Sequence, residues 1–537
     1  MGFSAKRATA MGGAIAFLVL CASSMNADDK PKDTKTPIKH IVVIFQENVS
    51  FDHYFAAYPH ALNPAGDPEF HARKDTPTIN GLSGPLLHRN PNSLAVGNGP
   101  DATGPFRLGR SQVATADQDH AYGPEQAAAN SGLMDLFPRS VGSAGSPPNA
   151  PPPIVKTKGL TMGYFDGNTV TAYWNYAQHF AMSDNSYGTT FGPSTPGAIN
   201  VVSGQTNGAV DTLNGTGDEI DGGSGSLTMF GDPDPLGDKC SISTRNQVRM
   251  AGRNIGDLLN EARVTWGAFM GGFDLTVKNP NGTTGCFRTS VSKHSGIALD
   301  YIPHHAWFQY YKSTANPEHL RPSSIEEIGH KGAANHQYDM NDFYAALKAG
   351  NLPAVSFLKA QGFQDGHAGY SNPLDEQEFV VTVVNAIEKS PEWNSTAIVV
   401  MYDDSDGWYD HQLGPIVNQS STAADALTGP GKCGDGSTAL PGIDEANKHA
   451  QGRCGYGPRL PLLVISPWAR ENFVDHTVTD QTSVIHFIED NWLGGKRIGG
   501  GSFDEIANSI EQMFEFSKMR AGSALILDAK TGVPVKK

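Results

Sequence analysis

The pattern of hydrophobic and polar positions predicts short buried strands that alternate with amphipathic helices. Uninterrupted β-branched runs are typical of strands buried on both faces, and they come at His40–Phe45 and Ala397–Tyr402. Similar runs predict strands at Val264–Met270, Ala354–Leu358 and Leu460–Ile465. Apolar residues at helical spacing predict helices over Thr169–Phe180, Gly192–Gly204, Ile255–Ala262, Asp339–Ala349, Leu374–Lys389 and Gln481–Trp492.

This alternation favours a single large α/β domain, with a mostly parallel sheet and helices on both of its faces. Shorter helices are expected over His120–Ala129 and His304–Tyr311. Stretches rich in Gly, Pro, Asn and Asp interrupt the pattern, and we expect loop-rich insertions at 59–153, 205–238 and 420–453. We find neither an internal repeat nor a linker, so residues 28–537 are expected to form one domain.

Polar residues come directly after two of the predicted strands, His40–Phe45 and Ala397–Tyr402. Glu47 and Asn48 come after the first run, and Asp403 and Asp404 after the second, with Asp406 two residues on. Ligands bind beyond the carboxyl ends of strands in open α/β sheets, and carboxylates packed this closely repel one another unless a cation lies among them. An all-oxygen set suits one hard divalent ion, Mg²⁺, Ca²⁺ or Mn²⁺. Asp406 could bind the metal or orient a histidine equally well.

Ser194 lies in the run Gly-Pro-Ser-Thr-Pro-Gly, where Ser or Thr ahead of Pro predicts a helix start. A serine at a helix N-terminus has free backbone N–H groups beside it, which suit a phosphate group. It becomes a nucleophile only with a metal or a base to activate it. The alternative is an ordinary helix cap, and Thr195 is the neighbouring candidate.

The charge and the ends of the chain restrict the class of protein. The formal net charge of −15 opposes binding to a nucleic-acid backbone. Residues 1–27 resemble an export signal, with Lys6 and Arg7 before a short apolar core. No later stretch is long and apolar enough for stable membrane insertion, so we expect a periplasmic or secreted protein. The sequence carries no signal for an oligomeric state.

Four cysteines remain once the predicted signal is removed. An even number in an exported protein favours disulfides over a metal site. Of the three possible connectivities, pairing of nearest neighbours, Cys240–Cys286 and Cys433–Cys454, is favoured because each pair brackets a glycine-rich insertion.

Linked motifs carry a family resemblance. The segment HIVVIFQENVSFDHYF (40–55) is similar to the opening of the bacterial phospholipase C and acid phosphatase superfamily of phosphoesterases. The likeness continues in order through DQDH (117–120), GPSTPG (192–197), HH (304–305), DGH (365–367), YDDSDGWYDH (402–411) and HFIEDNW (486–492). Val49 departs from the family pattern, which has Arg there.

The resemblance implies an alkaline-phosphatase-like fold and assigns roles to residues of this chain. Ser194 falls on the family's nucleophile, which is Ser in the acid phosphatases and Thr in many phospholipases C. Glu47, Asn48, Asp403 and Asp404, with Ser194, fall on the metal site. The histidines that fall on the phosphate pocket are His120, His304, His305 and His367.

Three functions are compatible with the sequence. The favoured one is a broad-specificity acid phosphomonoesterase that works through a phosphoserine intermediate. The second is a phospholipase C, which would bind a phospholipid head group and apply the same chemistry to a phosphodiester. The third is a catalytically silent exported binding protein, and the intact set of acids, histidines and Ser194 argues against it.

Overall fold

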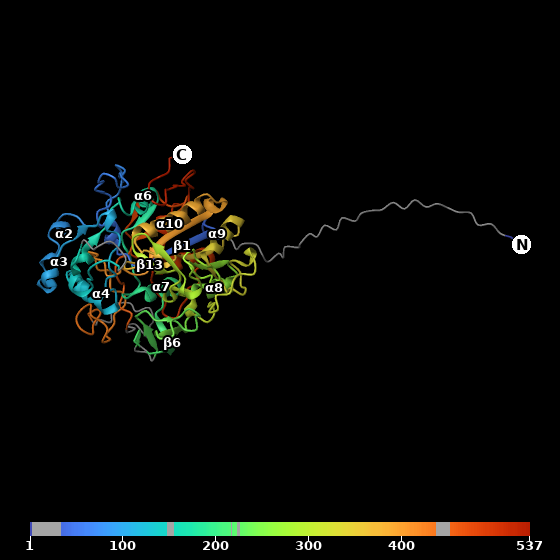
Figure 1. The fold of residues 1–537 in the computed structure, drawn as a ribbon, viewed down its shortest axis with the longest axis horizontal. Helices are drawn as coiled ribbons and strands as arrows, with labels where there is room; N and C mark the ends of the chain where they lie inside the picture. Colours follow the sequence, from blue (N-terminus) through green and yellow to red (C-terminus); the bar gives the residue numbers. More distant parts are fainter. Residues whose placement is uncertain (3–33, 148–154, 216, 223–225, 436–451, 537) are drawn as a thin grey trace. The chain divides into compact units, whose positions relative to one another are not determined.

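An eight-stranded sheet organises the fold (Figure 1). The computed structural model describes residues 1–2, 34–147, 155–215, 217–222, 226–435 and 452–536. Thr34–Lys537 forms one compact unit. The signal predicted at 1–27 lies outside the described residues, apart from Met1 and Gly2, as do positions 148–153 and 436–451 of the predicted insertions.

The main sheet is mostly parallel, as the sequence predicts. Its central strand, β1, pairs in parallel with β15 on one side and β16 on the other. Of the eight strands, β17 runs antiparallel to both of its neighbours. In spatial order the strands are β14 (Gln337–Asp339), β11 (Trp266–Met270), β15 (Val355–Lys359), β1 (His40–Gln46), β16 (Thr396–Tyr402), β17 (Leu462–Ile465), β4 (Ala181–Ser183) and β18 (Phe473–Asp475).

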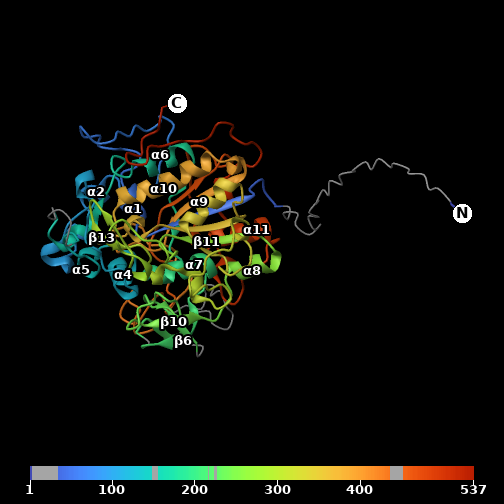
Figure 2. The same ribbon diagram turned by 45° about the vertical axis from the view of Figure 1, so that its right-hand side comes forward.

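Helices cover the sheet on both sides. In Figures 1 and 2, α6 and α10 lie above the strands and α7 and α8 below them. Their apolar faces bury a core to which every strand of the main sheet except β14 and β18 contributes at least two apolar residues. The helices that the periodicity predicts are present as α4 (Tyr122–Ala129), α6 (Thr171–His179), α7 (Ser194–Ser203), α8 (Ile255–Ala262), α9 (Met340–Ala349), α10 (Pro373–Glu388) and α11 (Ser483–Trp492).

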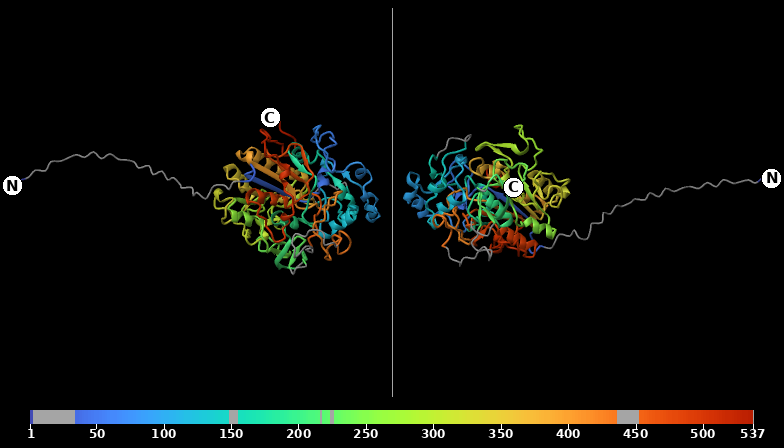
Figure 3. Two further views of the ribbon diagram at one scale, coloured as in Figure 1. Left: turned by 180° about the vertical axis from the view of Figure 1, so that it is seen from behind. Right: turned by 90° about the horizontal axis from the view of Figure 1, so that it is seen from below.

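Two local predictions are wrong. The stretch 205–238, predicted as loop, contributes to a second sheet, seen in green at the lower edge of the folded unit in Figure 1 and in the left panel of Figure 3. Its strands are β6 (Asn207–Leu213), β7 (Glu219–Asp221), β8 (Leu227–Met229), β9 (Asp234–Pro235) and β10 (Gln247–Met250). β6 and β7 are largely exposed or half-buried, and the buried strands β8, β9 and β10 have only two to four residues, so none shows the continuous apolar run that identifies a buried strand.

The helix predicted over His304–Tyr311 is instead two 3₁₀ turns, Pro303–His305 and Trp307–Tyr310. Ala306 between them has φ −89° and ψ 80°, outside the helical region, and this break stops the helix from continuing. The break lets His304 and His305 face different partners, Arg245 and Glu47.

The cysteines pair as the spacing favours, Cys240 with Cys286 and Cys433 with Cys454. Cys240 comes between β9 and β10, and Cys286 lies just before a hairpin of β12 (Thr289–Ser292) and β13 (Gly296–Leu299). The first disulfide therefore ties the second sheet to the segment that leads to His304. Within the described ranges, no helix has the length and hydropathy needed to cross a membrane.

Candidate active site

The carboxyl ends of β1 and β16 meet because the two strands are parallel neighbours. Gln46 pairs with Tyr402 in the register, so Glu47 and Asp403 leave the sheet side by side. Asn48 adopts a left-handed conformation, φ 60°, which is uncommon for a residue with a side chain. Its backbone N–H donates to Asp403 Oδ1 at 2.8 Å, and this bond holds the turn in place. All of these side chains are buried.

Ser194 is the first residue of α7, and its hydroxyl points into this cluster. Its Oγ lies 3.0 Å from Glu47 Oε2, 3.2 Å from Asp404 Oδ2 and 3.4 Å from Asn48 Oδ1. A hydroxyl has one proton and can satisfy only one of three converging acceptors. Oxygens gathered in this way around one point are the arrangement that a cation relieves.

The donor set fits a hard divalent ion. Asp403 Oδ2 is buried without a hydrogen-bond partner among the described residues. Burial and the neighbouring Asp403 raise the pKa of Asp404 well above its usual value, and burial raises that of Asp403. Carboxylates so placed bind a cation readily, and no thiolate is among them. The five oxygen donors predicted from the sequence are therefore brought together, namely Glu47, Asn48, Ser194, Asp403 and Asp404.

The close approach of α7 to β16 depends on Gly197. A Cβ at this position would collide with the backbone carbonyl of Asp403. The glycine thus lets the first turn of the helix lie directly against the loop that carries Asp403 and Asp404, and it sets the position of Ser194.

Lys359 is a site residue that the sequence analysis missed. It is the last residue of β15, it is 1% exposed, and its Nζ contacts Glu47 Oε1. His305 Nδ1 approaches the same oxygen at 3.2 Å. Glu47 Oε1 therefore bonds Lys359, and Oε2 faces Ser194. The signal was present, since Lys359 ends a buried run just as Glu47 does.

Burial lowers the pKa of His305 well below its usual value, and the nearby His304, His367 and Arg245 lower it further. His305 is therefore neutral in this structure. Neither ring nitrogen has a hydrogen bond of good geometry, because the 3.2 Å approach to Glu47 is poorly aligned.

A second group lies beside the oxygen cluster and contains His120, His367, Asp406 and Asp117. His120 Nδ1 is 2.9 Å from the Gln118 carbonyl and 3.4 Å from Asp406 Oδ1. The other ring nitrogen of His120, Nε2, is 3.4 Å from Asn48 Nδ2. The rings of His120 and His367 meet edge to face at 5.7 Å.

The two histidines of this group have opposite electrostatic surroundings. Burial alone would lower the pKa of His120, but the carboxylates of Asp404 and Asp406 outweigh burial and raise it well above its usual value. Burial lowers the pKa of His367. His120 is therefore the histidine that keeps its proton, and it can hold a phosphoryl oxygen or donate a proton.

The helix N-terminus offers fewer free N–H groups than the sequence analysis expects. Thr195 N donates to Asp232 Oδ1 at 2.9 Å, and Pro196 has no N–H. Asp232 belongs to the second sheet region, between β8 and β9, and its type and position gave no signal in the sequence. Of the first three positions of α7, only Ser194 keeps an N–H without a partner among the described residues.

His304 lies on the outer side of His305, and their rings meet edge to face at 4.5 Å. Arg245 Nη1 is 3.1 Å from His304 Nδ1, and Arg245 Nη2 donates to the Asp232 carbonyl at 2.6 Å. All the predicted histidines thus gather around the oxygen cluster, with His304 the most peripheral.

Glu125 joins the two loops that carry the site, and it was also missed. Its Oε1 accepts from Ser405 Oγ at 2.5 Å and its Oε2 from Gly192 N at 3.0 Å. One buried carboxyl group therefore ties the approach to Ser194 to the segment just after Asp404. Burial raises the pKa of Glu125 to about 7.

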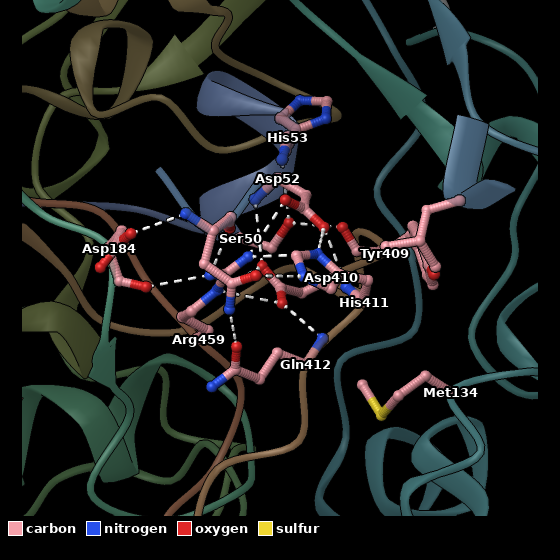
Figure 4. Close-up of polar contacts among 12 residues, drawn as sticks. Ser50, Asp52, His53, Met134, Asp184, Tyr409, Asp410, His411, Gln412 and Arg459 are labelled. Carbon is pink, nitrogen blue, oxygen red and sulfur yellow. Dashed lines mark hydrogen bonds and ion pairs between the residues drawn. The ribbon is translucent and has the colours of Figure 1, made fainter. Parts of the chain in front are cut away.

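Behind the site, a buried ion-pair network fixes α1 (Phe51–Phe55), the helix that follows Asn48 (Figure 4). Arg459 is fully buried and bonds both Asp52 and Asp410 at 3.1 Å. His411 Nδ1 lies 2.6 Å from Asp52 Oδ2. The guanidinium fills the space between the carboxylates, so this cluster supports the site and does not resemble a second metal centre.

Known proteins with related sequences include bacterial phospholipases C. The model of the Phosphoesterase family matches residues 38–493. A hemolytic phospholipase C of Pseudomonas aeruginosa is 22% identical over 462 residues, which are 84% of this chain and 52% of that protein. Phospholipase C A of Mycobacterium tuberculosis is 24% identical over 84% of this chain and 72% of its own length. The chain thus spans about half the length of the Pseudomonas relative.

Solved structures are more distant. Murine ectonucleotide pyrophosphatase/phosphodiesterase 5 is 11% identical, with a TM-score of 0.30 over 64% of this chain and 95% of its own. A protein of the alkaline phosphatase superfamily from Vibrio parahaemolyticus is 12% identical, with a TM-score of 0.27 over 75% of this chain and 74% of its own. Both scores are below 0.5, so the sequence match alone carries the family assignment.

Proposed function

The chain belongs to the Phosphoesterase family, and on that premise we propose that it hydrolyses phosphate esters through a phosphoserine at Ser194. The observation that carries the proposal is the convergence of Glu47, Asn48 and Asp404 on Ser194 Oγ. A serine hydroxyl surrounded by metal-type oxygen ligands, at the start of a helix, is placed to attack phosphorus.

The proposed metal centre consists of Glu47 Oε2, Asn48 Oδ1, Ser194 Oγ and the carboxylates of Asp403 and Asp404. When bound, Mg²⁺, Ca²⁺ or Mn²⁺ would favour the alkoxide of Ser194 and offset charge on the phosphoryl oxygens. Lys359 orients Glu47 from the opposite side, where His305 Nδ1 also lies, 3.2 Å from Glu47 Oε1.

In the proposed first step, Ser194 Oγ, which has given its proton to solvent, forms a bond to phosphorus as the alkoxide and the ester P–O bond breaks. The leaving alkoxide takes a proton from His120, whose pKa is held high by Asp404 and Asp406. Water then attacks phosphorus: its OH group leaves as part of the phosphate, its other proton returns to His120, and Ser194 is released as the alkoxide with which the cycle began. His304 and His367 border the same space and are assigned to the phosphoryl oxygens.

We favour a broad-specificity acid phosphomonoesterase, which is exported through the signal at 1–27. Ser in place of Thr at the nucleophile supports this branch of the superfamily. The second candidate, a phospholipase C, is favoured by the curated relatives, which carry that name. The two disulfides support an extracytoplasmic location in either case.

The deciding experiment measures hydrolysis of p-nitrophenyl phosphate and of phosphatidylcholine by the purified protein from acidic to alkaline pH. The proposal expects p-nitrophenyl phosphate to be the better substrate, with its optimum at acidic pH and its turnover lost on metal removal. Faster cleavage of phosphatidylcholine would select the phospholipase C. Turnover of neither substrate with added Mg²⁺, Ca²⁺ or Mn²⁺ would overturn the proposed activity.

A further inference from the structure

Arg245 contacts the site from the second sheet region, and no sequence motif marks it. It lies just before β10 and reaches His304, which precedes β14 on the main-sheet side. Its Nη1 is 3.1 Å from His304 Nδ1, and its Nη2 bonds the Asp232 carbonyl at 2.6 Å. This anchoring at two points fixes the guanidinium against the imidazole ring.

The chemistry of this contact determines the tautomer of His304. A guanidinium has only N–H donors and no lone pair to accept a hydrogen bond. His304 Nδ1 must therefore be the acceptor, so the proton of the neutral ring is on Nε2. No described residue accepts from Nε2. The ring thus keeps an N–H on Nε2 that has no acceptor among the described residues.

The surrounding charges are consistent with this assignment. Asp234 Oδ1 is 3.7 Å from His304 Nδ1 and 3.7 Å from Arg245 Nη1, too far for a hydrogen bond to either. The carboxylate of Asp232 is engaged with the backbone of Thr195. On the inner side the ring of His305 meets that of His304 edge to face at 4.5 Å. A second proton on His304 would have to point at the guanidinium of Arg245.

We propose that Arg245 is a positioning residue that holds His304 with its proton on Nε2, so that His304 donates a hydrogen bond to a phosphoryl oxygen of the substrate. This inference rests on the proposed function, because it takes a phosphoryl group as the ligand. It assigns His304 the role of a hydrogen-bond donor through Nε2.

A double-mutant cycle tests the inference. Arg245→Met removes the donor, and we expect it to lower kcat/KM for p-nitrophenyl phosphate by about 10- to 100-fold, the value of a hydrogen bond to a charged group. It should weaken binding of inorganic phosphate, measured by calorimetry, by a similar factor. In a His304→Ala background, Arg245→Met should change neither quantity further. Arg245→Gln, whose amide can donate to Nδ1, should restore most of both.

Arg249→Gln is the matched control, because Arg249 lies on β10 and pairs with the exposed Asp211. It should change neither quantity. Equal losses from Arg245→Met with and without His304, or no rescue by Arg245→Gln, would overturn the inference and leave Arg245 a purely structural role. If wild-type protein turns over neither substrate, the proposed function fails, and the phosphate-binding cycle still decides the role of Arg245.

Nitrogen-15 NMR of histidine-labelled wild-type protein shows directly which ring nitrogen of His304 carries the proton. It requires no Arg245 variant. His304 is assigned by the signal that disappears in His304→Gln. A proton on Nε2 is expected, and a proton on Nδ1 would overturn the inference even if every Arg245 variant failed to fold.

Discussion

At the scale of single residues, the site brings buried carboxylates and a buried ammonium group into contact. Glu47, Asp403 and Asp404 come together, and one ammonium group, Lys359, faces them. Burial lowers the pKa of Lys359, while the neighbouring carboxylates oppose that effect. The carboxylates outnumber the ammonium, which is consistent with a site that also takes a divalent ion.

Replacement of Lys359 by Met should destabilise the metal-free protein by about 3–5 kcal/mol, because it leaves a buried carboxylate without its partner. A divalent ion should offset part of that loss, so added metal should raise Tm more in the variant than in the wild type. Thermal unfolding with and without a chelator measures both effects. Lys348→Met, an exposed lysine on α9, is the control. An unchanged metal-free Tm would contradict this role for Lys359.

Residue types at strand ends predicted the oxygen cluster correctly because parallel strands must end at one edge of a sheet. The same rule would have found Lys359. Glu125, Asp232 and Arg245 could not be predicted in this way. Each acts through a tertiary contact made by a segment outside the main sheet, and a lone Glu, Asp or Arg in a loop is usually solvated.

At the scale of elements, α7 carries Ser194, the proposed nucleophile, and the loop after β16 carries Asp403 and Asp404. Their contact distance depends on Gly197, because no other residue lacks a Cβ. The start and end of α7 were predictable from Ser-Thr-Pro and Gly204, whose φ of 59° suits glycine. The second sheet was not, since its Gly-, Asn- and Asp-rich strands resemble loop.

Gly197→Ala should push the first turn of α7 away from Asp403 and move Ser194 Oγ from its position. We expect kcat to fall by about 100-fold, the cost of a small misplacement of reacting groups. Ala198→Gly, at the next position of the same helix, tests the general effect of a change in helix propensity. Steady-state kinetics measure kcat for both variants, and circular dichroism shows whether each variant is folded. Near-normal kcat in a folded Gly197→Ala protein would show that the contact is dispensable.

At the scale of the whole molecule, several carboxyl groups are buried with a raised pKa. Burial raises the pKa of Glu376, Glu388 and Asp480 to about 7. Glu376 is fully buried and accepts hydrogen bonds from Tyr54 and Tyr402. Such groups keep a proton in the folded state at pH values where the unfolded chain has lost it.

The contribution of these carboxyl groups to stability should therefore decrease as pH rises from about 4.5 to about 7. In this window each of them binds fewer protons in the unfolded chain than in the folded protein, so its contribution to the free energy of unfolding falls with pH, while buried histidines of lowered pKa such as His53 and His336 act in the opposite direction. For Glu376, the shift from 4.5 to about 7 corresponds to about 3 kcal/mol. Glu376→Gln should reduce the slope, whereas Glu378→Gln on the same helix should not. Denaturant unfolding at several pH values measures the slope of the free energy of unfolding against pH. Identical slopes in the wild type and in Glu376→Gln would contradict a raised pKa of Glu376.

In the proposed mechanism, Ser194 becomes phosphorylated during turnover. The most direct measurement is acid quenching of the enzyme during hydrolysis of a phosphorus-32-labelled monoester, followed by peptide mapping with mass spectrometry. We predict label on the peptide that contains Ser194, at Ser194 and not at Thr195, and no label in Ser194→Ala, whose kcat should fall by about a thousandfold or more. Label on Thr195, or normal turnover by Ser194→Ala without a phosphoenzyme, would contradict the account.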